Sequence, residues 1–112
     1  MDFSVMTERA LAVRAAYEEY ETRNYGRPWT LEELTLGLVG DLGDLAKLIQ
    51  AREGVRAIEN APAALEHELA DVLWSVIVIA ERCNIDLAAA FSETMTGLEQ
   101  GLADAAAPTA DV

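Results

Sequence analysis

Three stretches of the sequence carry large apolar side chains at alternating intervals of three and four residues, the spacing that lines one face of an α-helix. The longest of these stripes is formed by Leu31, Leu34, Leu38, Leu42, Leu45 and Ile49. A second comprises Leu65, Leu69, Val72, Val76 and Ile79, and a third comprises Leu87, Phe91, Met95, Leu98 and Leu102. Amphipathic helices bury such stripes against one another, so the sequence predicts an all-α fold.

Signals at the ends of these stretches predict four helices. Thr30 and Glu33 have the spacing of a capping box, in which each side chain accepts a hydrogen bond from the other residue's backbone at a helix start. Pro62 suits the first turn of a helix, Asp86 suits an N-cap, and Gly54 suits a helix end. The expected helices span residues 7–23, 30–53, 62–82 and 87–102. Short connections between them favour a four-helix bundle.

A length of 112 residues fits one domain, which we expect to span residues 1–102, with a disordered tail at 103–112 that is rich in Ala, Asp and Pro. Such a chain buries only about two-thirds of its unfolded surface. On the helix expected at 62–82, Trp74 and Ile77 extend apolar surface beyond the main stripe. We therefore expect a homo-oligomer, in which a second subunit packs near Trp74.

The charge balance argues against direct binding to nucleic acid. The chain has twenty Asp and Glu residues and eight Lys and Arg residues, which gives a formal net charge of −12. Such a charge repels a phosphate backbone. A single cysteine, Cys83, forms no internal disulfide, and residues 1–6 do not resemble a signal segment, so we expect a cytoplasmic protein. The most apolar run, residues 72–80, is too short to span a membrane, which predicts a soluble protein.

Two pairs of acidic residues lie at the edges of apolar stripes: Asp41 with Asp44, and Glu68 with Asp71. Residues three apart on an ideal helix lie about 60° apart, so each pair shares one side of its helix. A carboxylate at a core boundary is costly to ionise unless it is paired or bound to a cation, and the stripes contain no Lys or Arg. The alternative is that these acids are simply solvated on the helix surface.

The residue types indicate a hard cation if the two pairs converge. Carboxylates suit Mg²⁺ or Mn²⁺, whereas a zinc site usually contains His or Cys, of which this chain has only His67 and Cys83. Magnesium commonly joins one or two protein carboxylates to substrate phosphates. The sequence therefore predicts that the two acidic pairs bind Mg²⁺ together with a nucleotide polyphosphate.

A resemblance to the MazG-like all-α nucleoside triphosphate pyrophosphohydrolases is carried by two stretches, residues 29–49 (WTLEELTLGLVGDLGDLAKLI) and 66–87 (EHELADVLWSVIVIAERCNIDL). That family has a Glu-x-x-Glu motif on one helix, a Glu-x-x-Asp motif on the next, and then a Gly-Ile-Asp-Leu-like turn, where this chain has residues 84–87. The resemblance implies that the catalytic and metal-binding residues are Asp41, Asp44, Glu68 and Asp71.

The same resemblance implies the reaction and the assembly. The expected enzyme is magnesium-dependent and cleaves a nucleoside triphosphate between its α and β phosphates, releasing a nucleoside monophosphate and pyrophosphate. Its expected role is the removal of unwanted or non-standard nucleotides. Members of this family are commonly homodimers or dimers of dimers, so the resemblance implies one of these assemblies.

The chain departs from the family pattern at two points. The first acidic pair is Asp-x-x-Asp where the family prefers Glu, and Asp reaches about one methylene less far. Residues 91–101 (FSETMTGLEQG) contain no basic residue, whereas relatives carry Lys, Arg or Asn there that contact the phosphates. A second hypothesis is therefore a catalytically degenerate relative that binds a nucleotide or a protein partner without hydrolysis. A third is a purely structural bundle.

Three further residues are candidate substrate contacts. Lys47 follows Asp44 by one turn and is placed to reach a phosphate, although a surface ion pair with Asp44 is the commoner explanation. Trp29 and Trp74 offer aromatic faces to a nucleobase. Alternatively, Trp29 packs against the start of the helix at residue 30, and Trp74 faces a second subunit.

Overall fold

The computed structural model describes residues 1–107 as four α-helices with no β-strand among them. These helices are α1 (Phe3–Tyr25), α2 (Leu31–Arg52), α3 (Ala61–Arg82) and α4 (Leu87–Ala106). The prediction of an all-α chain with four helices is confirmed. None of the described helices is both long enough and apolar enough to cross a membrane. The cytoplasmic location stays a prediction.

Side-chain caps fix the starts of α2 and α4, as the sequence indicated. At α2, the Glu33 backbone N–H donates to the Thr30 hydroxyl oxygen at 3.2 Å, and the Thr30 N–H donates to Glu33 Oε1 at 3.0 Å. At α4, the Asp86 carboxylate accepts a hydrogen bond from the Ala89 N–H at 3.1 Å. Each cap satisfies backbone donors that have no partner inside the helix.

The outermost ends of the chain differ from the sequence-based expectation. Helix α1 begins at Phe3 rather than Thr7, because Asp2 caps it by accepting a hydrogen bond from the Val5 N–H at 3.0 Å. Helix α4 continues to Ala106, four residues into the expected tail. Ala107 follows the helix as its C-cap, and residues 108–112 of that tail lie outside the described residues.

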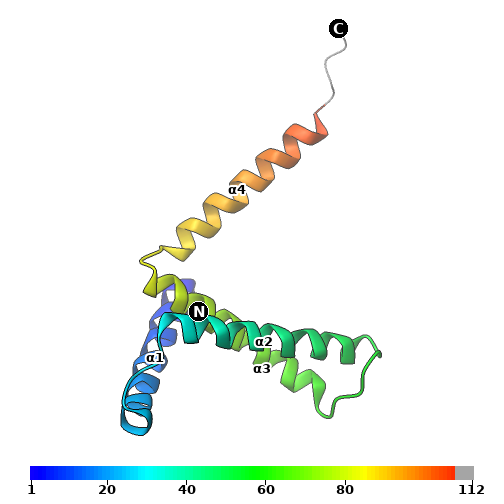
Figure 1. Cartoon of the computed structure of the whole chain (residues 1–112). Coiled ribbons are helices and arrows are strands. Elements are labelled where there is room, and N and C mark those ends of the chain that lie inside the picture. The colour runs from blue at the N-terminus through cyan, green and yellow to red at the C-terminus, as the bar shows by residue number, and fades with distance from the viewer. Residues whose placement is uncertain (108–112) are drawn as a thin grey trace.

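Helices α2 and α3 form an antiparallel hairpin that carries the acidic motifs (Figure 1). Helix α1 packs against another part of α3, so α3 is the central helix of the fold. The buried apolar residues reflect this arrangement, since Ile77, Val78 and Ala80 all belong to α3. Leu48 of α2 and Ala10 of α1 are buried as well.

A buried ion pair within α1 also holds the segment that leads into α2. The Arg14 guanidinium donates to Glu21 Oε1, and both residues are buried. The same Glu21 oxygen accepts the backbone N–H of Trp29 at 2.8 Å. Arg82 of α3 donates to Glu18 of α1 at 2.6 Å, which ties these two helices together. These polar contacts fix the chain that leads into α2.

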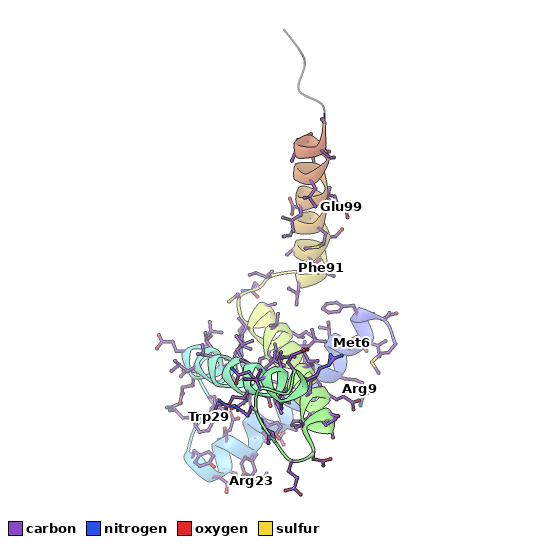
Figure 2. The ribbon with its side chains drawn as sticks, turned by 90° about the vertical axis from the view of Figure 1, so that its right-hand side faces the viewer. Met6, Arg9, Arg23, Trp29, Phe91 and Glu99 are labelled. Atoms are coloured by element: carbon purple, nitrogen blue, oxygen red, sulfur yellow. The ribbon has the colours of Figure 1, made fainter. Side chains whose placement is uncertain are left out.

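The expected four-helix bundle is not closed within one chain, because α4 extends away from the other three helices (Figure 1). The radius of gyration is 19.0 Å, whereas a compact chain of this length has about 13 Å. The turn at residues 83–86 directs α4 outward, and α1 covers α3 instead. The apolar stripe of α4 is exposed as a result, with Phe91 63% and Leu102 72% accessible (Figure 2).

Candidate active site

Three of the four predicted carboxylates converge where α2 faces α3. One carboxylate oxygen from each of Asp41, Asp44 and Glu68 lies within 4.8 Å of the other two. Helix α2 supplies two of them because residues three apart share one side of a helix. Helix α3 supplies the third because it packs along α2. Asp41 and Glu68 are half-buried, as their positions at the stripe edges suggested, whereas Asp44 is exposed.

Of the three carboxylates, that of Glu68 has surroundings that disfavour its ionised form. Its Oε1 atom is buried without a hydrogen-bond partner. Burial and then the negative charges of Asp41, Asp71 and Asp44 raise the pKa of Glu68 above its ordinary value of 4.5. Within residues 1–107, no Lys or Arg forms an ion pair with a trio carboxylate. The site therefore holds uncompensated negative charge.

The trio has the donor chemistry of a hard-cation site. Three carboxylate oxygens within reach of one ion fit the all-oxygen ligands that Mg²⁺ and Mn²⁺ prefer. A divalent cation would supply the missing positive charge and a partner for the buried Glu68 oxygen. We conclude that Asp41, Asp44 and Glu68 can hold a metal ion.

Asp71, the fourth predicted ligand, lies beside the trio and has a different contact. It follows Glu68 by three residues on α3 and is half-buried. Its Oδ2 atom is 3.1 Å from Nε2 of His67, one turn earlier on the same helix. Asp71 also contributes to the wall of a pocket between α1 and α3. It thus borders both the carboxylate trio and this pocket.

The α1–α3 pocket combines apolar, aromatic and cationic side chains. Its volume is about 450 Å³, within the size range of small-molecule sites. Tyr17 and Trp74 line it with ring centroids 5.6 Å apart, and Arg9 lines it from α1. Figure 2 shows Arg9 and Met6, another lining residue, on the first turns of α1. The pocket therefore offers aromatic faces close to a candidate metal ligand.

The two tryptophans occupy different surroundings. The Trp74 indole N–H donates to the Ala10 carbonyl oxygen at 3.0 Å, so α1 of the same chain packs on this side chain. Trp29 stacks on Tyr25 with ring centroids 5.1 Å apart at the entrance to α2. Asp41 lies about 15 Å further along α2. The structure thus brings Trp74, but not Trp29, close to the acidic residues.

Lys47 lies one turn after Asp44 on α2 and is exposed. The described residues include no ion pair between Lys47 and Asp44, which the sequence favoured as the commoner explanation. The lysine ammonium is therefore available beside the trio.

Sequence reasoning missed the contribution of α1 to this region. Arg9 and Tyr17 line the pocket, but no motif in the sequence distinguishes them from other surface residues of a helix. The contact between His67 and Asp71 did have a signal, because residues four apart lie next to each other on a helix. From the sequence, His67 is interpreted as a solvated helix residue rather than a ligand, and its side chain is 75% accessible.

Comparison with known proteins identifies the family. Residues 29–100 match the model of the MazG nucleotide pyrophosphohydrolase domain, a range that includes all four acidic residues. The chain belongs to the MazG family. No solved structure gave a significant match.

Several curated relatives of this MazG chain share one name. The dCTP pyrophosphatase 1 of Rattus norvegicus is 44% identical over 59 residues, which cover 48% of this chain and 35% of the rat protein. The Bos taurus protein of the same name is 33% identical over 92 residues, which cover 76% of this chain and 54% of that protein. The chain thus spans about a third to a half of the length of these relatives.

Proposed function

We propose that this MazG-family chain is a magnesium-dependent nucleoside triphosphate pyrophosphohydrolase that cleaves between the α and β phosphates. The observation that carries the proposal is the convergence of three carboxylates around a buried, unpartnered oxygen of Glu68. Membership in the MazG nucleotide pyrophosphohydrolase family supports the same reaction. The proposed products are a nucleoside monophosphate and pyrophosphate, and the proposed role is the removal of unwanted nucleotides.

In the proposed site, Asp41, Asp44 and Glu68 hold the cation. Asp71, which lies outside that group of oxygens and lines the pocket, turns toward the ion to complete the ligand set. Mg²⁺ held by these residues would supply positive charge for the phosphoryl oxygens and would activate a water for attack. The carboxylates fix the geometry of attack because helices α2 and α3 hold them in place. Lys47, one turn from Asp44, is positioned to contact a phosphate oxygen.

The α1–α3 pocket is the proposed site for the nucleoside. Tyr17 and Trp74 offer aromatic surface to a base, and Asp71 connects this pocket to the carboxylate trio. The relatives named dCTP pyrophosphatase make dCTP the first substrate to test. Trp29 is assigned the structural role of packing at the start of α2, since it stacks on Tyr25 far from the acids.

A homodimer or a dimer of dimers is proposed because the chain leaves apolar surface uncovered on two helices. On α2, Leu36 is 70% and Val39 is 61% exposed. Gly40 and Gly43 lie on the same outward side, and a Cβ atom added at either would meet no atom within 4 Å. Glycine in a helix interior costs about 1 kcal/mol relative to alanine, so close approach of a second copy would explain their presence.

The proposal is tested by incubating the purified protein with Mg²⁺ and a panel of canonical and modified nucleoside triphosphates, dCTP included. We expect a monophosphate and pyrophosphate, and we expect Asp44→Asn and Glu68→Gln to abolish turnover. Glu66→Gln is the matched control, because Glu66 is exposed on α3 and does not belong to the trio. Absence of both products across the panel would defeat the proposal.

A catalytically degenerate relative remains the second candidate, and one observation favours it. Helix α4 carries no Lys or Arg and extends away from the other three helices (Figure 1). Calorimetry distinguishes the two candidates, because a degenerate relative binds a triphosphate without forming product. A purely structural bundle would show neither binding nor a rise in melting temperature with Mg²⁺.

A further inference from the structure

His67 is the chain's only histidine, and its side chain contacts a proposed metal ligand. Its Nε2 atom lies 3.1 Å from Oδ2 of Asp71, the distance of an ion-pair contact. The two residues lie four apart on α3, so the helix itself holds their side chains next to each other. Neither residue forms another ion pair in the part of the chain that the structure describes.

The position of Asp71 gives this contact a consequence beyond local helix stability. Asp71 lines the α1–α3 pocket, and its charge contributes to the raised pKa of Glu68. Repulsion from the trio therefore acts on the Asp71 carboxylate. Asp71 lies outside the group of oxygens that are within 4.8 Å of one another, so it must turn one oxygen toward the trio to join the ligand set. The contact of His67 with Oδ2 restrains the carboxylate on one side and leaves Oδ1 as the oxygen that can turn.

We propose that His67 is a positioning residue that holds Oδ2 of Asp71, so that a bound cation needs only to draw Oδ1 toward the trio to complete its ligand set. This inference rests on the proposed function, since it requires a cation at the trio. Carboxylates that bind metals are commonly oriented by partner groups that do not touch the metal, and losing one typically weakens metal affinity or activity about 10- to 100-fold.

A merely structural role predicts a different result. His67 is exposed, its side chain being 75% accessible, and an exposed pair of this kind contributes little to folding. Removing the imidazole should therefore leave the melting temperature of the metal-free protein unchanged. A positioning role predicts a large change in metal affinity without a change in stability.

The experiment compares His67→Ala, His67→Gln and the control Glu66→Ala with the wild type. Glutamine keeps an N–H donor that pairs with Asp at helical spacing, so His67→Gln should restore the contact that His67→Ala removes. Glu66 is exposed and adjacent to His67, and it is His67, not Glu66, that contacts Asp71. Calorimetry with Mn²⁺ alone, without nucleotide, gives the metal affinity of each protein.

We expect His67→Ala to weaken Mn²⁺ binding about 10- to 100-fold, and to raise the Mg²⁺ concentration for half-maximal turnover by a similar factor, while the KM for the triphosphate changes much less. His67→Gln should come within a few-fold of the wild type. Equal Mn²⁺ affinity in the wild type and His67→Ala would overturn the inference. A His67→Gln variant as impaired as His67→Ala would also overturn it.

The result for the wild type separates this inference from the proposed function. Wild-type protein that binds no Mn²⁺ would refute the metal site itself, and the role of His67 with it. Wild-type protein that binds Mn²⁺ but hydrolyses nothing would refute the proposed activity alone. In that case the Mn²⁺ affinities of the two His67 variants still decide whether His67 positions Asp71.

Discussion

Replacing Glu68 by Gln should stabilise the metal-free protein while removing its response to magnesium. Glu68 is held near Asp41 and Asp44 with no basic residue to compensate the three charges in the described chain. Its raised pKa reflects burial and this repulsion. Glutamine has nearly the same shape without the charge, so it removes the repulsion but also a ligand.

The expected size follows from Coulomb's law. Two unit charges 4.8 Å apart interact by about 1 kcal/mol in water and about 3.5 kcal/mol at the effective dielectric of a protein surface. Glu68 is half-buried, so we expect its replacement to raise the free energy of unfolding by about 1–2 kcal/mol. For a chain of this size, 1 kcal/mol corresponds to about 4 °C in melting temperature.

The assay is thermal unfolding at pH 7 in EDTA and in excess Mg²⁺. Wild-type protein should gain about 2.7 kcal/mol of stability when Mg²⁺ exceeds its dissociation constant 100-fold. Glu68→Gln should have a higher melting temperature than the wild type in EDTA and should gain little from Mg²⁺. In excess Mg²⁺ the wild type should therefore have the higher melting temperature. Glu66→Gln, an exposed change on the same helix, should behave like the wild type in both conditions.

Two outcomes would refute this reasoning. A Glu68→Gln variant that is less stable than the wild type in EDTA would show that the carboxylate is not held against repulsion. A variant that gains as much stability from Mg²⁺ as the wild type would show that Glu68 is not a ligand.

Three other substitutions test the fold and the pocket. Glu21→Gln should lower the free energy of unfolding by about 3 kcal/mol in chemical denaturation, because it leaves the buried charge of Arg14 unpaired. Burial alone would raise the pKa of Glu21, but hydrogen bonds from Arg14 and the Trp29 N–H lower it below 4.5. The loss should therefore be complete above about pH 4.5 and shrink as the pH falls through the lowered pKa. Trp74→Leu should raise the KM for the triphosphate about three- to tenfold in steady-state kinetics, with a smaller effect on kcat, because aromatic contact contributes about 0.5–1.5 kcal/mol. Gly40→Ala should stabilise the monomer by about 1 kcal/mol yet weaken self-association in analytical ultracentrifugation, and unchanged association would contradict the proposed interface.

Features of the structure that depend on neighbouring residues of one helix could be predicted from the sequence. Thr30 and Asp86 cap their helices as predicted, because a cap needs only a side-chain oxygen and a backbone N–H two or three residues away. The convergence of Asp41 with Glu68 was also predictable, since each lies at the edge of an apolar stripe and the stripes of consecutive helices face each other.

Features that depend on distant parts of the chain were not predictable in this way. The direction of α4 is set by the turn at residues 83–86 and by α1 covering α3, and neither is encoded in the stripe of α4 itself. Trp74 was assigned to a second subunit because the sequence gave no sign that its indole would bond to Ala10. Asp71 matched the family motif, but its contact with His67 requires the side-chain geometry.

The central claim is that the acids of α2 and α3 bind the cation for cleavage of a nucleoside triphosphate between its α and β phosphates. Phosphorus NMR of dCTP incubated with the protein and Mg²⁺ tests it most directly, because each phosphorus product has its own signal. We predict dCMP and pyrophosphate with the wild type and Glu66→Gln, and unchanged dCTP with Glu68→Gln or in EDTA. Formation of dCDP and inorganic phosphate, or turnover that survives Glu68→Gln, would contradict it.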